Sequence, residues 1–305
     1  MIKLVKMNDI TKANLVTHAG VFHADEVVAT VILKKIFGDV TVCRTFKVPT
    51  GAISDNVIIY DVGGGKYDHH QKGGNGLRDN GVPYAATGLI WQAYGLKLLA
   101  NNNSCNPELV WNYIDREIIQ GIDAVDNGKM PRVNYPTHSL SFTQIISAFN
   151  PNWDSEEDTD IAFARAVEFA ECVFDRFWAK AESKAKAKSI VETAIEQAVD
   201  HIMVLEKFVP WEGAVFSSEN SKAATIYFAV FPSNRGGYNW KCVPDLLGSF
   251  GQRCTVPTAW WGLQGLELQK LTGVKTATFC HPAGFIGGAE TLEDTIKMAR
   301  IAIEG

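Results

Sequence analysis

Asn56-Val-Ile-Ile-Tyr60 is a short apolar run that ends abruptly at Asp61 and a glycine triplet. Two similar runs, Asn14–Thr17 and Val40–Thr45, precede it, and a helical pattern begins near Asp25. Short runs that are apolar on both faces and separated by helices are typical of a parallel sheet covered on both sides. We therefore predict an α/β fold, in which ligands collect at the carboxyl ends of the strands.

The chain changes character after this region. Asp158–Met203 contains neither Gly nor Pro, which favours one long helix, and we expect that helix to bend or break near Lys180–Lys188. Ala224–Phe231 and Thr276–Cys280 are predicted strands of a second sheet, and Leu292–Ile303 is a predicted final helix. We predict an N-terminal parallel-sheet domain, a long helical connector and a smaller C-terminal α/β domain. The expected borders are 1–150, 151–205 and 206–305.

The composition is that of an ordinary globular protein, with 46% apolar and 21% charged residues among 305. No stretch of about 18 apolar residues occurs, so we expect no membrane-spanning helix. The N-terminal residues lack the pattern of a secretory signal, and the six cysteines form no C-x-x-C pair, so we expect a cytoplasmic protein. A net charge of -5 argues against strong non-specific attraction to long nucleic acids, without excluding a local basic groove.

Histidine and aspartate gather in four segments of the first domain where strands are predicted to end. Four of the seven histidines lie in these segments, and the other three are His138, His201 and His281. This clustering exceeds what scattered surface histidines would show. The four segments are Thr17–Glu26, Tyr60–Gly64, Asp68–Gln71 and Gly121–Gly128.

These side chains indicate a pair of divalent cations. Carboxylate and imidazole groups suit manganese, magnesium, cobalt, iron or zinc, and no thiolate in the segments demands a softer ion. Several carboxylates buried together repel one another and raise their pKa values, and cations remove that cost. A water bridging two ions about 3.5–4 Å apart becomes a nucleophilic hydroxide near neutral pH. The predicted metal ligands are His18, His23, Asp25, Asp61, His69 and Asp123.

Simpler interpretations exist for several of these residues. Asp68-His69-His70 could form a polar turn, and His23 could be a core histidine with a satisfied hydrogen bond. We interpret Glu26 as an acid in the first turn of a helix, where the helix dipole favours it. Asp126 could be a ligand, a group that supports a ligand, or part of a turn with Asn127-Gly128.

Asp68-His69-His70, downstream of Asp61, resembles the DHH phosphoesterase superfamily, which includes RecJ-like nucleases and manganese-dependent inorganic pyrophosphatases. More closely, the chain resembles the melanocyte-proliferating-gene (Myg) family of metal-dependent exonucleases. The resemblance covers nearly the whole chain. Its further motifs are Thr17–Glu26, Asp123–Gly128, Trp240-x-x-x-Pro244, Trp261-x-Gly-Leu263 and His281-x-Ala-Gly-Phe-Ile-Gly-Gly288.

The resemblance implies a role for each metal ligand. Asp61 would bridge the two ions, His69 would bind the second ion, and Asp123 matches the fourth-motif ligand better than Asp126. The usual first motif has two aspartates, whereas a histidine stands at one of those positions here. The resemblance implies Mn²⁺ as the bound ion, and this departure from the usual motif leaves Mg²⁺, Co²⁺ and Zn²⁺ as alternatives. The first-motif ligands would be His18, His23 and Asp25.

Two further groups of residues are predicted to act on the substrate. His70 would face the substrate phosphate, and Asp68 would either orient a histidine or support the metal from behind its direct ligands, which makes these two the predicted catalytic residues. The stretch after His281 is expected to be a glycine-rich loop that precedes a helix. Its glycines could serve only to form a turn, or their backbone N–H groups could bind a phosphate at the start of the helix, and we favour the second interpretation. The predicted substrate-binding residues are His281, Gly284, Gly287, Gly288, Arg235 and Arg253, the two arginines as phosphate contacts.

The residues and the resemblance together predict a metal-dependent phosphodiesterase, a 3′–5′ exonuclease on RNA or short oligonucleotides that uses a metal-activated water. One alternative is a pyrophosphatase-like hydrolase of a small phosphoanhydride or nucleotide. Another is a non-catalytic protein that binds metal or nucleotides. The sequence leaves the oligomeric state open, with a homodimer as one option.

Overall fold

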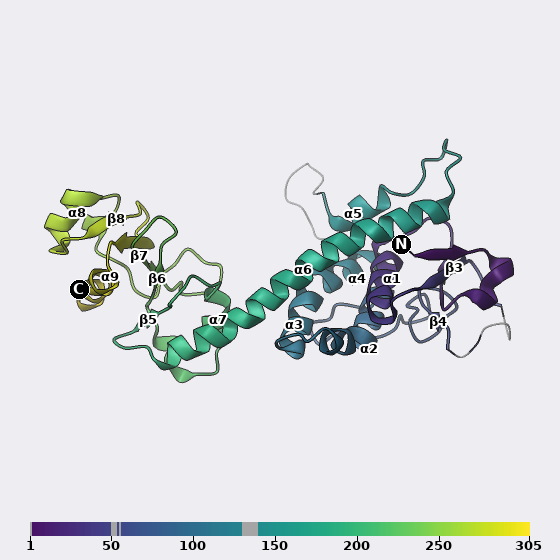
Figure 1. Ribbon diagram of the computed structural model, residues 1–305, viewed down its shortest axis with the longest axis horizontal. Coiled ribbons are helices and arrows are strands. Elements are labelled where there is room, and N and C mark those ends of the chain that lie inside the picture. Colours follow the sequence, from purple (N-terminus) through teal and green to yellow (C-terminus); the bar gives the residue numbers. More distant parts are fainter. Residues whose placement is uncertain (1, 50–53, 55, 130–139) are drawn as a thin grey trace. The chain divides into compact units, whose positions relative to one another are not determined.

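The computed structural model describes residues 2–49, 54, 56–129 and 140–305 (Figure 1). The chain divides into two compact units, residues 1–183 and 184–305, each with its own β-sheet and helices. The predicted α/β class is therefore confirmed, whereas the predicted borders at 150 and 205 stay predictions. His138 lies outside the described residues.

The sheet of the first unit is parallel throughout, with strand order β1-β3-β2-β4. Successive residues of β3, Val42–Thr45, are all buried, and so are the first three residues of β2. Because neighbouring side chains on a strand point to opposite faces, unbroken burial means that both faces of the sheet are covered, as the sequence predicted. The strands are β1 (Lys3–Val5), β2 (Leu15–His18), β3 (Thr41–Thr45) and β4 (Ile58–Ile59).

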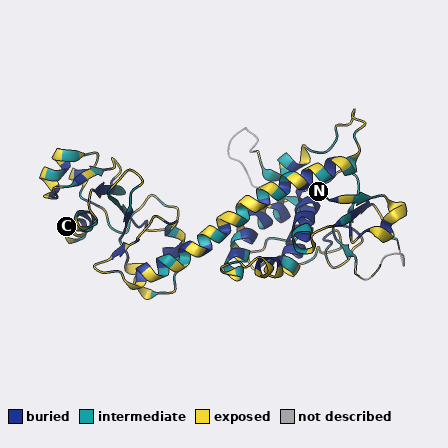
Figure 2. Cartoon of the chain, viewed as in Figure 1, coloured by how far each residue is buried: buried dark blue, intermediate teal, exposed yellow. Residues whose placement is uncertain are grey.

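Helix α1 (Ala24–Phe37) follows β2 and is buried over most of its length (Figure 2). It begins where the backbone N–H of His23 donates a 3.0 Å hydrogen bond to the carboxylate of Glu26, half of a capping box. It packs against α2 (Ala86–Asn101). The other short helices of this unit are η1 (Met7–Lys12), α3 (Pro107–Ile114), the π-helical turn η2 (Asp115–Ile119), α4 (Gln120–Asp126) and α5 (Phe142–Ser147).

Helix α6 (Thr159–Glu196) runs without interruption and contributes residues to both units. The break expected near Lys180–Lys188 does not occur, because this stretch is rich in alanine and lysine, which favour a continuous helix. In the first unit α6 buries Phe163 and Phe174, and in the second it buries Val191. No helix in the described parts of the chain is both long and apolar enough to cross a membrane.

The second unit is built on a mixed sheet with strand order β5-β6-β7-β9-β8. Strands β5 and β6 are parallel, and the other neighbours are antiparallel. The strands are β5 (Ile202–Val204), β6 (Phe228–Pro232), β7 (Tyr238–Cys242), β8 (Ala277–Cys280) and β9 (Ile286–Ala289). The helices are α7 (Glu212–Phe216), η3 (Ser221–Thr225), η4 (Thr258–Trp260), α8 (Gly265–Thr272) and α9 (Leu292–Glu304).

One prediction for this unit is wrong. The stretch expected to be a glycine-rich loop contains strand β9, in which Gly287 pairs with Trp240 and Gly288 pairs with Asn239. A Cβ atom on Gly287 would collide with the Trp240 indole, and one on Gly288 would collide with the backbone of β7. Glycine is required here by close packing within the sheet, and the helix that follows starts only at Leu292.

Candidate metal centre

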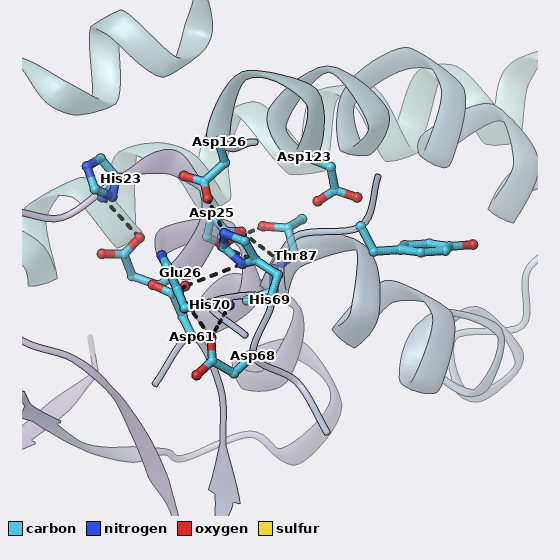
Figure 3. A network of polar contacts seen from close by, with 12 residues as sticks. His23, Asp25, Glu26, Asp61, Asp68, His69, His70, Thr87, Asp123 and Asp126 are labelled. Carbon is cyan, nitrogen blue, oxygen red and sulfur yellow. Dashed lines mark hydrogen bonds and ion pairs between the residues drawn. The ribbon is translucent and has the colours of Figure 1, made fainter. Parts of the chain in front are cut away.

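The carboxyl end of the parallel sheet in the first unit brings four distant segments together (Figure 3). Strand β2 ends at His18, and Asp61 comes shortly after β4. Asp25 lies in the first turn of α1, and Asp126 is the last residue of α4. Parallel strands present their carboxyl ends at one edge, which explains the convergence.

Asp61 occupies the middle of this cluster. It adopts a left-handed backbone conformation, with φ of 56°, that a non-glycine residue rarely takes and that is often found at functional sites. Its side chain is buried, and Oδ1 has no hydrogen-bond partner among the described residues. Burial, followed by the nearby carboxylates of Asp25 and Glu26, raises the pKa of Asp61 to about 11. A metal-free site therefore holds this carboxyl in its protonated form at neutral pH.

His69 lies between three carboxylates. Its Nε2 atom is 2.9 Å from Oδ2 of Asp126, and its Nδ1 atom is 3.8 Å from both Oδ2 of Asp25 and Oδ1 of Asp61. Nδ1 is buried and has no hydrogen-bond partner in the described structure. Burial acts to lower the pKa of His69, but the Asp126 hydrogen bond and the charge of Asp25 outweigh it, so the pKa is raised.

Asp25 is held in place by the start of α2. Its two carboxylate oxygens accept hydrogen bonds from the backbone N–H groups of Ala86 (3.1 Å) and Thr87 (2.9 Å). These are N–H groups of a first helical turn, which lack partners within the helix and attract negative charge. Burial and the charge of Asp126 nevertheless dominate and raise the pKa of Asp25 to about 6.

His18 and Glu26 form a second group with Asp61, in which each residue offers one donor atom within 4.8 Å of the others. Glu26 is buried, and its Oε1 atom has no hydrogen-bond partner among the described residues. Burial and the neighbouring Asp25 raise the pKa of Glu26 well above its ordinary value. Burial and the Arg44 guanidinium lower the pKa of His18, which favours the neutral imidazole that metal ions require.

Asp68 and His70 lie beside Asp61. The Asp68 carboxylate accepts hydrogen bonds from the backbone N–H groups of Gly64 (2.6 Å) and His70 (2.9 Å), and it lies 3.0 Å from Nδ1 of His70. Burial acts to raise the pKa of Asp68, but these hydrogen bonds outweigh it and lower the pKa. The His70 side chain remains 58% exposed, so it is the part of this cluster that a solute can reach.

Asp123 does not join these groups. Its Oδ2 atom is 2.8 Å from the guanidinium of Arg78, and its Oδ1 atom accepts a hydrogen bond from the backbone N–H of Gly88 (2.9 Å). Arg78 also forms a two-point ion pair with Asp115 in the π-helical turn, at 2.8 and 3.1 Å. Burial and the charge of Asp25 raise the pKa of Asp123 to about 8 despite Arg78. His23, the residue before α1, contributes its backbone to the helix start and its side chain to the wall of a pocket.

This donor set fits divalent cations. Within these donor groups, three buried atoms have no hydrogen-bond partner among the described residues, namely Oδ1 of Asp61, Nδ1 of His69 and Oε1 of Glu26, and all three are atom types that bind such ions. In protein interiors buried polar atoms are almost always paired, so these three point to a missing partner of positive charge. Asp126 and Glu26 were not predicted as ligands, although both lie inside the quoted motifs. The groups able to hold an ion are Asp61 with Asp68, His69 and His70; His18 with Glu26 and Asp61; and Asp25 with His69 and Asp126.

Comparison with known proteins identifies the family. The family model MYG1_exonuc, which carries the description "Uncharacterised protein family (UPF0160)", matches residues 14–303. The chain belongs to this MYG1 family. The match spans both the candidate metal centre and the second unit. No solved structure matches the chain.

Curated MYG1 relatives cover almost the same length. The MYG1 protein YER156C of Saccharomyces cerevisiae is 32% identical over 336 residues, covering 99% of each chain. The MYG1 protein of Dictyostelium discoideum is 30% identical over 321 residues, covering 96% of each. The human relative, named MYG1 exonuclease, is 30% identical over 320 residues, covering 94% of this chain and 85% of its own.

The predicted substrate-binding residues of the second unit have varied surroundings. The guanidinium of Arg253 donates hydrogen bonds to the backbone oxygens of Ala223 (2.7 Å) and Ile226 (3.1 Å), so it stabilises the unit's own backbone. Arg235 is exposed in the turn between β6 and β7 and lines a cavity of about 650 Å³. His281 is exposed and accepts a hydrogen bond from Ala283, and Gly284 packs against the indole of Trp261. Their role in substrate binding stays a prediction.

Proposed function

We propose that this MYG1-family chain is a metal-dependent phosphodiesterase, a 3′–5′ exonuclease that acts on RNA or short oligonucleotides. The observation that carries the proposal is the convergence of Asp25, Asp61, His69 and Asp126 around donor atoms that lack partners. The mammalian relatives named MYG1 exonuclease support the choice of reaction.

The donor geometry supports an assignment of two ions. One ion would be held by Asp25, His69 and Asp126, and the other by His18, Glu26 and Asp61, which are two of the three donor groups. The sequence-predicted ligand His23 is next to Glu26, whose carboxylate accepts a hydrogen bond from the His23 backbone N–H. We assign Asp126 in place of the sequence-predicted Asp123, because Arg78 already neutralises Asp123. Manganese is the favoured ion, and magnesium, cobalt and zinc suit the same ligands.

The bound ions would supply a nucleophilic water at neutral pH and neutralise charge on the phosphate. The chain's own residues complete the site. Asp68 accepts from Nδ1–H of His70 and fixes that ring, which leaves Nε2 of the exposed imidazole for a phosphate oxygen or for the oxygen that leaves.

The proposal is tested by incubating the purified protein and Mn²⁺ with short RNA labelled at its 5′ end, single-stranded DNA of the same sequence, and pyrophosphate. Stepwise shortening of the RNA from its 3′ end is the expected result. Phosphate release from pyrophosphate alone would favour the phosphoanhydride hydrolase instead. Absence of turnover on every substrate, with metal bound, would favour a binding protein.

We also infer a cytoplasmic location. Cys43, Cys242 and Cys280 are buried thiols whose pKa values are raised by burial, to about 12 for Cys242 and about 11 for Cys280. Inert, reduced thiols of this kind suit a reducing compartment. Cell fractionation of the tagged full-length chain tests the location, and recovery in a membrane or secreted fraction would contradict it.

A further inference from the structure

A pocket of about 340 Å³ opens beside the candidate metal centre within the first unit. Three residues of the centre, Asp25, His70 and Asp126, form part of its wall. A phosphate held by His70 and the ions of the proposed function would therefore lie at the edge of this pocket, and the group attached to that phosphate could enter it.

Apart from His23 and Ala24 at the start of α1, the rest of the wall comes from α4 and α5. Helix α4 contributes the apolar side chains of Ile122 and Val125, and α5 contributes the neutral polar side chains of Thr143, Gln144 and Ser147. No lysine or arginine lies among the described residues that line it. A second phosphate in this space would face the carboxylates of Asp25 and Asp126, which is costly in a partly desolvated site.

We propose that this pocket holds the terminal nucleoside of the substrate. The inference rests on the proposed function and adds to it the place where the terminal nucleoside binds, between α4 and α5 beside the candidate metal centre. Ile122 and Val125 contact the flat base or the sugar carbons, and the hydroxyl and carboxamide groups on α5 hydrogen-bond to the sugar.

The size of the pocket agrees with a single nucleoside. Small-molecule sites span roughly 300–1,000 Å³, so a pocket of 340 Å³ lies at the lower end of that range. The carboxamide oxygen of Gln144 accepts a 2.8 Å hydrogen bond from the backbone N–H of Ser141, which orients this side chain before a ligand binds. A pocket limited to one residue of the substrate suits an enzyme that removes nucleotides from an end.

Two chromogenic diesters test the inference directly. Uridine 5′-(4-nitrophenyl phosphate) carries a nucleoside, whereas bis(4-nitrophenyl) phosphate does not. In both, water attacks phosphorus, the bond to 4-nitrophenolate breaks and the leaving group departs with the bonding electrons. With Mn²⁺ present, kcat/KM is expected to be higher for the uridine ester by about tenfold or more. Equal values, or a preference for the bis ester, would overturn the inference.

A variant that fills the pocket links this preference to the structure. Ser147→Trp places an indole at the wall, and it is expected to reduce the ratio of kcat/KM for the uridine ester to that for the bis ester by about tenfold. Lys97→Trp adds the same side chain at an exposed position of α2 outside the pocket and should keep the wild-type ratio. If Ser147→Trp and Lys97→Trp gave the same ratio of kcat/KM for the two esters, the assignment of this pocket to the nucleoside would be contradicted.

Competition by the free nucleoside provides a check that needs no variant. Uridine is expected to inhibit hydrolysis of the bis ester by the wild-type protein competitively, and pyrophosphate at the same concentration should inhibit it less. Inhibition by pyrophosphate alone would overturn the inference while leaving phosphodiester hydrolysis intact. Failure of the proposed function is a different result, in which neither ester is hydrolysed by metal-loaded protein.

Discussion

The Nε2 atom of His69 lies 2.9 Å from Oδ2 of Asp126, the last residue of α4. This contact joins the loop after β4 to a helix that lies more than fifty residues further along the chain. Both side chains are largely buried, and the second ring nitrogen of His69 faces Asp25 and Asp61 without a hydrogen-bond partner among the described residues. The pair therefore marks the edge of a site in which a cation would complete the charges.

The placement of Asp126 leads to the first prediction. Asp126→Asn is expected to weaken Mn²⁺ binding by at least about tenfold, because it removes a charged ligand, while Asp123→Asn should change the affinity by less than about threefold. Asp123 faces Arg78 instead, so its loss should lower the melting temperature. Calorimetric titration of chelator-treated protein with Mn²⁺ compares the two variants, and a larger loss of affinity in Asp123→Asn would reverse the assignment.

The buried carboxyls predict a pH dependence of stability. The pKa values of Asp25 (about 6) and Asp61 (about 11) lie above the ordinary 3.8, so the folded metal-free protein binds more protons than the unfolded chain above about pH 4. Its stability must then fall as pH rises through this window. In chelator, the melting temperature of wild type should decrease between about pH 5 and pH 8, and more steeply than in Asp61→Asn. Parallel curves for the two proteins would refute the electrostatic account.

His70 and His69 are expected to respond differently to substitution. His70 is exposed and anchored by Asp68, whereas His69 is buried between carboxylates. His70→Ala should reduce kcat by about 100-fold or more with little change in Mn²⁺ affinity. His69→Ala should reduce both kcat and Mn²⁺ affinity. Equal loss of metal in both variants would show that the two histidines have been assigned the wrong way round.

The ion pair between Arg78 and Asp115 is predicted to stabilise the region that carries Asp123 and Asp126. Both side chains are more than nine-tenths buried. Arg78→Met should cost about 3–5 kcal/mol in the free energy of unfolding, because it leaves buried carboxylates unpaired. Arg116→Met, at an exposed neighbour of Asp115, is the control and should change stability by less than about 0.5 kcal/mol. Urea titration measures both, and equal midpoints would contradict the prediction.

Sequence patterns predicted strands β2, β3 and β4 of the first sheet but not β1, and they indicated which segments meet at its carboxyl edge. Strand ends marked by His18 and Asp61, and the Asp68-His69-His70 motif, converge because parallel strands share one edge. The choice between Asp123 and Asp126 could not be made in this way. Both residues lie in one short helix, three positions apart, and they differ in their three-dimensional neighbours: Asp123 faces Arg78, whereas Asp126 faces His69.

Two other features depend on packing that a sequence pattern does not display. Gly287 and Gly288 suggested a loop because glycine is rare in strands, yet the Trp240 indole and the backbone of β7 approach too closely for any side chain there. Glu26 looked like a first-turn acid of α1, and its carboxylate does cap that helix through one oxygen. Its other oxygen is buried near His18 and Asp61, which becomes apparent only in three dimensions.

The metal content of the purified chain tests the central claim most directly. Protein stripped with a chelator, reloaded with Mn²⁺ and freed of excess ion should hold two ions per chain by elemental analysis. Asp61→Ala should keep its circular dichroism spectrum and lose most of that metal, because Asp61 belongs to two of the three donor groups. A wild-type chain that retains no Mn²⁺, or an Asp61→Ala chain that retains the full amount, would contradict the account.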